Sequence, residues 1–333
     1  MQTRIVTTDG LKQQVLEAGE GPLVLLIHGF PELGISWRAQ VKALAEAGYH
    51  AVAPDMRGYG GTEKPAETGA YTILDLVGDM VDLVRALGET RCAVVGHDWG
   101  APVAWHCALM RPDVFTAVAG LSVPFQPRRP GGAPTPIMAA MSKRAGLGEL
   151  YINQFQDPDH HRIFEADVPN GLRKGFYAYD GATPTERQST GFIAPGHNFL
   201  SEVAEDATLP PWMSEAHHGE YVAAFTAGGF KGPLDWYRNI DRNWALTAFL
   251  QDARIRQPSM FIVGERDPVR HYAGQHEATL KDWLTDLRFQ TVLPGAGHWL
   301  QQERPGEVNA ALIGFLKSLG AERGLAPPPT GLI

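Results

Sequence analysis

The sequence predicts an α/β fold, in which a mostly parallel β-sheet carries helices on both faces and a helical segment is inserted between two strands. Three observations support this prediction. Short, continuous apolar runs such as Leu23–Ile27 are typical of strands buried on both faces of a parallel sheet. Segments with helical periodicity separate these runs. Residues 125–245 show helical periodicity and many aromatic residues, but no strand-like run.

The predicted strands are apolar runs bounded by polar or turn-forming residues. In chain order they are Leu23–Ile27 and residues 50–55, 91–96, 116–122, 259–264 and 288–293. The predicted helices have apolar residues three and four positions apart, and glycine follows most of them. They cover residues 37–45 (before Gly48), 73–87 (before Gly88), 101–110 (with Pro102 in the first turn) and 307–319 (before Gly320).

A stretch rich in proline, glycine and arginine, residues 124–136, predicts a domain boundary. We expect a core domain built from residues 1–124 and 246–333, and a helical cap at 125–245. Ligands of parallel sheets bind at the carboxyl ends of the strands. A cap at that edge would shield the site from water. Residues 327–329 are prolines in a tail that we expect to be frayed.

The composition excludes several classes of partner. The formal net charge is −8 and the pI is about 5.8, which argues against binding to nucleic acid or an anionic membrane. The two cysteines, Cys92 and Cys107, do not make a disulfide framework, and no run is long and apolar enough to span a bilayer. With the polar first ten residues, these features predict a cytoplasmic protein. No motif requires a metal or an organic cofactor, and a homodimer stays open.

The segment Gly96-His97-Asp98-Trp99-Gly100 lies between a predicted strand and a predicted helix. Its pattern, glycine, any residue, nucleophile, any residue, glycine, is that of the nucleophile elbow of α/β-hydrolases, with aspartate in place of the usual serine. The turn is sharp, so a side chain at either glycine would crowd the backbone. The alternative role for Asp98 is a helix cap.

Two loops after other strands supply the remaining chemistry of this fold. The segment 28–31 (His-Gly-Phe-Pro) would present the backbone N–H of Phe30, and the elbow that of Trp99, as an oxyanion hole; its alternative is a tight turn. His298 follows the last strand and is placed to act as a general base. Asp267 would orient it, with Glu265 as the nearby rival for this role.

With these residues together, the chain resembles the epoxide hydrolases of the α/β-hydrolase superfamily. The matching segments are residues 28–32, 55–61, 96–100, 232–239, 264–267 and 295–302. The segment 232–239 resembles the cap segment that holds one catalytic tyrosine, which here is Tyr237. A second family tyrosine shortly precedes a Phe-Gln-acid-Pro segment, here residues 155–158, which assigns Tyr151. The rivals of Tyr151 are Tyr177, Tyr179 and Tyr221.

The resemblance implies an enzyme that converts an epoxide into a vicinal diol through an ester on Asp98, with no cofactor. Phe30, Trp99 and Trp236 would line an apolar pocket for a small epoxide. One alternative is a haloalkane dehalogenase with the same Asp98, His298 and Asp267. That family often has asparagine at the position of Phe30, which disfavours it. The other alternative is a non-catalytic binding protein on the same fold.

Overall fold

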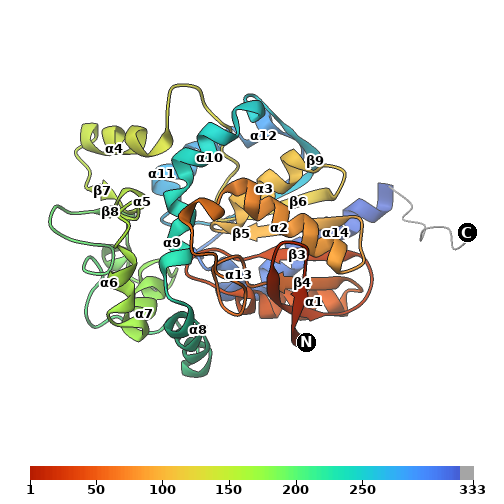
Figure 1. Ribbon diagram of the computed structural model, residues 1–333, viewed down its shortest axis with the longest axis horizontal. Coiled ribbons are helices and arrows are strands. Elements are labelled where there is room, and N and C mark those ends of the chain that lie inside the picture. Colours follow the sequence, from red (N-terminus) through yellow and green to blue (C-terminus); the bar gives the residue numbers. More distant parts are fainter. Residues whose placement is uncertain (323–333) are drawn as a thin grey trace, which may run out of the picture.

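The computed structural model describes residues 1–322, so the prolines at 327–329 lie outside the described residues (Figure 1). An eight-stranded sheet has the order β1-β2-β4-β3-β5-β6-β9-β10. The strands are β1 (Gln2–Thr7), β2 (Lys12–Ala18), β3 (Leu23–Ile27), β4 (His50–Pro54), β5 (Cys92–His97), β6 (Phe115–Leu121), β9 (Ile255–Gly264) and β10 (Leu284–Leu293). All neighbours from β4 to β10 pair in parallel, and β1 and β2 are antiparallel additions at one edge.

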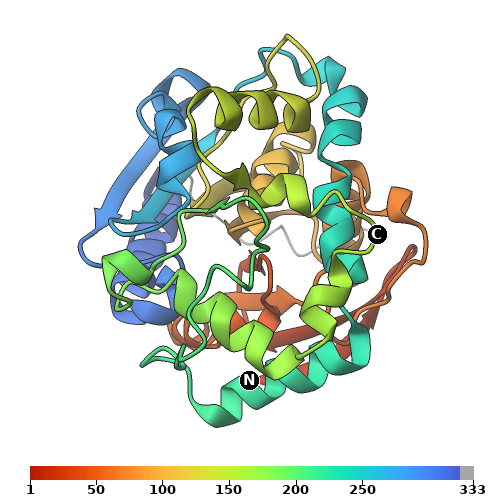
Figure 2. The same ribbon diagram turned by 90° about the vertical axis from the view of Figure 1, so that its left-hand side faces the viewer.

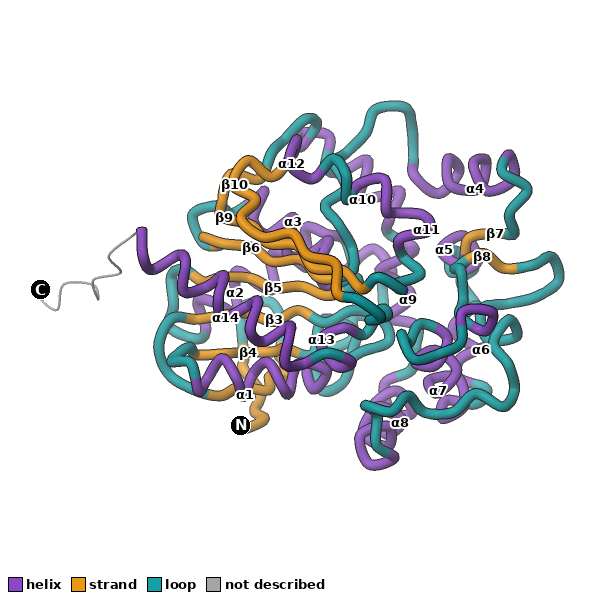
Figure 3. Tube along the Cα trace, turned by 180° about the vertical axis from the view of Figure 1, so that it is seen from behind, coloured by secondary structure: helices purple, strands orange, loops and turns teal. Residues whose placement is uncertain are grey.

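Helices cover both faces of the sheet, as predicted (Figure 3). On one face α1 (Arg38–Glu46) and α14 (Pro305–Glu322) pack against Val24 and Leu26 of β3. On the other, α2 (Ile73–Ala86) and α3 (Gly100–Met110) pack against the alternate residues of the same strand. The central strands are therefore buried on both faces, which explains their continuous apolar sequences.

The structure corrects several element boundaries. The hairpin of β1 and β2 was not predicted, because most residues of these strands are exposed or half-buried and interrupt any apolar run. Strands β9 and β10 begin about four residues earlier than predicted, in polar sequence. Helix α14 passes through Gly320 and continues to Glu322, so the predicted stop at Gly320 was wrong. A helix tolerates an interior glycine at modest cost.

The segment between β6 and β9 is mostly helical and lies beyond one end of the sheet (Figures 1 and 2). Its helices are α4 (Pro134–Arg144), α5 (Tyr151–Gln154), α6 (His161–Glu165), α7 (Val168–Ala178), α8 (Glu215–Gly228), α9 (Lys231–Arg238) and α10 (Ile240–Leu246). It also contains a two-stranded antiparallel ladder, β7 (Glu149–Leu150) with β8 (Phe192–Ile193). Strands of two residues are too short to give a sequence pattern, so this ladder was missed.

Shorter helices connect the larger elements. They are α11 (Arg270–Ala273), α12 (Leu280–Trp283), α13 (Leu300–Glu303) and the 3-10 helices Gly34–Trp37, Thr68–Ala70, Thr185–Arg187, Ala248–Leu250 and Gly274–His276. Within residues 1–322, no helix combines the length and the apolar character needed to cross a bilayer.

Candidate active site

Asp98 lies at the sharp turn between β5 and α3. Its φ is 50°, in the left-handed region that side chains other than glycine rarely adopt. The flanking glycines are required by contact: a Cβ on Gly96 would lie 2.0 Å from the carbonyl oxygen of Gly100, and one on Gly100 would lie 2.1 Å from that of Ile27. Such strain persists where the surrounding structure fixes it, and it is common at functional sites.

The carboxylate of Asp98 is buried and held from two sides. Its Oδ1 atom accepts a hydrogen bond from the backbone N–H of Phe30 at 2.7 Å, and its Oδ2 atom lies 3.4 Å from Nε2 of His298. Burial alone would raise the pKa of Asp98, but His298 and the Phe30 N–H outweigh it and lower the pKa. Asp98 is therefore ionised at neutral pH.

His298 lies between two carboxylates. Its Nδ1 atom is 3.1 Å from Oδ1 of Asp267, on the side opposite Asp98. Burial alone would lower the pKa of His298, but the charges of Asp267 and Asp98 raise it to about 10. Glu265, the rival for the role of Asp267, instead accepts the N–H of Gly295 and is exposed.

Ser122 joins this network, and the sequence did not single it out. Its hydroxyl donates to Oδ2 of Asp267 at 2.6 Å and lies 2.9 Å from Nδ1 of His298. Because Ser122 donates its proton to Asp267, its oxygen is free to accept from the Nδ1–H of His298. Ser122 directly follows β6. Its φ is 70°, so its backbone, like that of Asp98, lies in the left-handed region.

Tyr151 begins α5 and Tyr237 lies on α9, and both line the cavities that Asp98 lines. Their ring centroids are 6.0 Å apart. Burial raises the pKa of both phenols, so both stay protonated at neutral pH. A third phenol, that of Tyr272, lies 3.4 Å from that of Tyr151 and was missed because it follows no motif.

Of the three rivals of Tyr151, two lie away from both cavities and one lines the smaller cavity. Tyr177 contacts Arg187 and Tyr221 packs on Phe176, and neither lines a described cavity. Tyr179 does line the smaller cavity, and its carbonyl accepts the backbone N–H of His298 at 2.9 Å.

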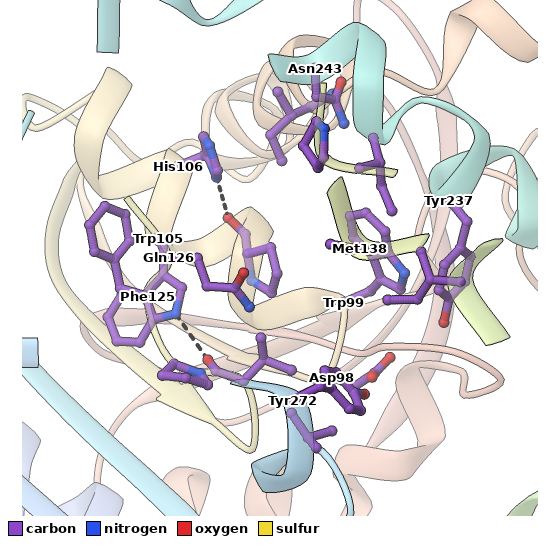
Figure 4. Close-up of a pocket in the computed structure, with 18 of the residues that line it drawn as sticks. Asp98, Trp99, Trp105, His106, Phe125, Gln126, Met138, Tyr237, Asn243 and Tyr272 are labelled. Atoms are coloured by element: carbon purple, nitrogen blue, oxygen red, sulfur yellow. Dashed lines mark hydrogen bonds between the residues drawn. The ribbon is translucent and has the colours of Figure 1, made fainter. Parts of the chain in front are cut away.

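Two cavities meet at Asp98. The larger has a volume of about 240 Å³ and is walled mostly by apolar and aromatic residues, which come from α3, α4, α10, the loop after β6 and several other segments (Figure 4). The smaller, about 20 Å³, lies beside His298, Phe30 and Tyr179. A cavity holds one water once it exceeds roughly 10–15 Å³, so the smaller one has room for a single water.

Phe30 and Trp99 each line one of these cavities, Phe30 the smaller and Trp99 the larger. The expected pocket role of Trp236 was wrong. Trp236 lines neither cavity; it packs edge-on behind Trp99, and its indole N–H donates to the carbonyl of Arg57 at 3.1 Å. Neighbouring residues on a helix point about 100° apart, and Tyr237 takes the face of α9 toward Asp98.

The half-buried carboxylate of Glu303 and the buried ring of His97 support the loop that carries His298. Oε2 of Glu303 accepts the N–H of Gly297 at 2.7 Å, and Oε1 accepts that of Trp299 at 2.9 Å. Burial raises the pKa of Glu303 to about 7, with Asp180 adding to this shift and the N–H donors opposing it. On the other side of the loop, the carbonyl of His298 lies 2.8 Å from Nε2 of His97.

No group of three or more histidine, cysteine, aspartate or glutamate side chains in the described part of the chain is arranged to hold a metal ion. The chemistry that the visible groups can perform is attack by a carboxylate, donation of a proton by phenols, and activation of water by an imidazole.

Comparisons with known proteins agree with this site. A family model described as alpha/beta hydrolase fold matches residues 22–305. The chain is 45% identical to Epoxide hydrolase A of Mycobacterium tuberculosis over 323 residues, which cover 95% of this chain and 97% of the relative. The solved structure of an epoxide hydrolase from an endophytic Streptomyces matches with a TM-score of 0.90 at 41% identity, covering 96% of each chain. The epoxide hydrolase of Vigna radiata gives 0.85 at 35%, covering 95% and 98%.

All three of these relatives are named epoxide hydrolases. Each match covers nearly the whole of this chain and nearly the whole of the relative. The structure adds the buried Asp98, His298 and Asp267 network at the ends of the strands. The chain therefore belongs to the epoxide hydrolases of the α/β-hydrolase fold.

Proposed function

We propose that this epoxide hydrolase opens its substrate by attack of the Oδ2 atom of Asp98 on an epoxide carbon. The observation that carries the proposal is the hydrogen bond that the backbone N–H of Phe30 donates to Oδ1 of Asp98, which fixes the orientation of the carboxylate. Oδ1 accepts this short hydrogen bond, whereas Oδ2 has only the longer contact of 3.4 Å with Nε2 of His298, so Oδ2 is the oxygen placed for attack. Because the pKa of Asp98 is lowered, its carboxylate is already ionised and needs no base to activate it.

The phenols of Tyr151 and Tyr237 supply the proton that the leaving oxygen needs. As Oδ2 bonds to carbon, the ring C–O bond breaks, and the developing alkoxide takes a proton from a phenol. The products of this step are a hydroxy ester on Asp98 and a phenolate. Support comes from the cavities, because both phenols and Asp98 line the same space.

Formation of the ester changes the charge on His298. The carboxylate of Asp98 is one of the groups that raise the pKa of His298, and that charge disappears in the ester. The imidazolium then loses its proton to the phenolate and becomes a base. Asp267 and Ser122 keep the ring in place through Nδ1, which leaves Nε2 facing the ester.

Hydrolysis of the ester completes the cycle. His298 takes a proton from a water, for which the 20 Å³ cavity beside it offers room, and the hydroxide adds to the carbonyl carbon of the ester. The backbone N–H groups of Phe30 and Trp99 stabilise the oxyanion on Oδ1. The tetrahedral intermediate then collapses, and the bond between the carbonyl carbon and the diol oxygen breaks. The diol oxygen takes the proton of the added hydroxyl group, which leaves Asp98 as a carboxylate and His298 as an imidazolium.

We further propose that residues 125–245 form a cap on a core of residues 1–124 and 246–333, since Tyr151 and Tyr237 come from that segment and face Asp98. The apolar walls of the larger cavity favour an apolar epoxide. A cytoplasmic location is supported by Cys92 and Cys107, which are both unpaired and buried.

A single turnover in heavy-oxygen water tests the covalent route. The product peptide containing Asp98 must carry the label, because water adds to the carbonyl carbon of the ester. An unlabelled Asp98 after turnover would rule out the ester. As a parallel control, diol formation from an aryl epoxide is compared between the wild type and Asp98→Asn, with halide release from a bromoalkane measured beside it. Halide release without diol would favour the dehalogenase alternative.

A further inference from the structure

The larger cavity has a second polar region away from Asp98. Most of its walls are apolar, but His106 of α3 and Asn243 of α10 also line it. Figure 4 shows both on the side of the cavity opposite Asp98 and Tyr272. Nothing in the reaction at Asp98 uses either residue.

Helix α3 runs along the larger cavity from one region toward the other. Trp99, Pro102 and His106 are spaced by three and four residues, which places them on one face of the helix, and all three line the cavity. At a rise of about 1.5 Å per residue, the seven residues from Trp99 to His106 span roughly 10 Å. A substrate that reaches both regions is therefore an extended one.

The ring of His106 is ready to accept a hydrogen bond. Its Nδ1 lies 2.7 Å from the carbonyl oxygen of Pro102, and since a carbonyl can only accept, Nδ1 carries the hydrogen. Burial lowers the pKa of His106, partly offset by that bond, so the ring is neutral at neutral pH and Nε2 has a free lone pair. Among residues 1–322, Pro102 is the single hydrogen-bond partner of this ring.

Asn243 supplies the complementary donor. Its Oδ1 accepts the backbone N–H of Ile73 at 2.8 Å, which fixes the amide so that its NH₂ group remains the donor. His106 thus offers an acceptor and Asn243 a donor, and a hydroxyl group can bond to either residue because it both donates and accepts. They do not match a carboxylate, which only accepts and carries charge.

The walls also lack a positive charge. No lysine or arginine is among the described residues that line the larger cavity. Placing a carboxylate there would remove it from water without a counter-ion, which is costly. We propose that His106 and Asn243 form a subsite for a neutral hydroxyl group on the substrate, in the part of the larger cavity that lies across from Asp98 and the epoxide ring. This inference rests on the epoxide hydrolase activity and adds a substrate class to it.

The test uses three terminal epoxides that share one alkyl chain and end in a hydroxyl, a methyl or a carboxylate group. The wild type should show a kcat/KM for the hydroxyl compound roughly fivefold above that for the methyl compound, as one net hydrogen bond implies, and the carboxylate should be the poorest. His106→Phe should abolish the preference for the hydroxyl and leave the methyl compound within about twofold of the wild type.

Two further variants separate recognition from packing. His106→Gln places an amide where Nε2 lies and should restore much of the hydroxyl preference. His161→Phe removes a histidine that also bonds a carbonyl, that of Pro158, but lines neither cavity, and it should behave as the wild type.

The proposal is overturned if the wild type does not distinguish the hydroxyl from the methyl compound, or if it prefers the carboxylate. It is also overturned if His106→Phe slows all three substrates alike, because that would show a packing role. Lack of diol from any of the three would overturn the activity itself, a result that is distinct from activity without discrimination.

Discussion

The Nε2 atom of His298 lies 3.4 Å from the Oδ2 atom of Asp98, so that an imidazolium and a carboxylate face each other before substrate arrives. This pairing has opposite consequences for the two steps. It keeps Asp98 ionised for attack, and it keeps His298 protonated and thus inactive as a base until the ester forms. The charges of the site thus support the order of the two steps in the proposed mechanism.

The variant His298→Gln should separate the two steps. Glutamine cannot take a proton from water, but Asp98 and the phenols remain, so the ester should form and accumulate. Intact-protein mass spectrometry after mixing with an aryl epoxide should show one adduct. Asp98→Asn is the control and should show none. Absence of the adduct in His298→Gln would mean that the first step also requires the imidazole.

Single substitutions of the phenols should slow the first step. Tyr151→Phe and Tyr237→Phe each remove one proton donor and should lower the rate of ester formation by roughly tenfold, whereas the double variant should lose on the order of a hundredfold or more. Rapid-mixing measurements of adduct formation would show this. Tyr221→Phe removes a buried phenol that lines neither cavity and serves as the control. If each single variant kept the full rate, neither phenol would be the proton donor.

Much of the fold could be predicted because strands that are buried on both faces of the sheet have continuous apolar sequences. Strand β3 has the predicted bounds, Leu23–Ile27, and all its residues are buried. The hairpin of β1 and β2 gives no such run because its residues are mostly exposed or half-buried. The ladder of β7 and β8 depends on contacts between segments more than forty residues apart, which no local pattern records.

The site shows the same division. Asp98, Asp267 and His298 follow three strands, and the chain order of the fold was enough to name them. Ser122 could not be named, because it reaches Asp267 only through the pairing of β6 with β9, where Leu121 lies opposite Ile262. The choice of Trp236 as a wall residue failed because periodicity alone does not tell which face of α9 sees the cavity.

Removal of the Ser122 hydroxyl should affect the second step alone. Ser122→Ala takes one hydrogen bond from Asp267 and one from His298, both of which orient the base. Ester hydrolysis should slow by roughly tenfold while ester formation keeps its rate. Single-turnover kinetics resolve the two steps. Ser259→Ala, which removes a serine hydroxyl that bonds within β9, is the matched control. Equal slowing of both steps would point to general disruption instead.

Glu303 should make the activity depend on pH near 7. Its two oxygens accept the N–H groups of Gly297, Trp299 and Gly181, and an ionised carboxylate can accept from all three donors. As the pH falls through the pKa of about 7, Glu303 gains a proton that points at one of these donors. The hydrogen bonds that position the loop of His298 then weaken, so kcat should fall at pH values below the pKa of Glu303.

The variant Glu303→Gln tests this dependence, because its amide resembles the protonated acid at every pH. Its kcat should be lower by roughly tenfold above pH 7, and the decline near pH 7 that the wild type shows should be absent. The pH profile of kcat between about pH 5 and pH 9 measures both effects. Glu17→Gln alters a buried carboxylate in the β1–β2 hairpin, where it pairs with Arg4, and should keep the wild-type profile. If the decline of kcat near pH 7 persists in Glu303→Gln, another group causes it. His298 would then be the first group to examine, because loss of the Asp98 charge in the ester lowers the pKa of His298 toward that range.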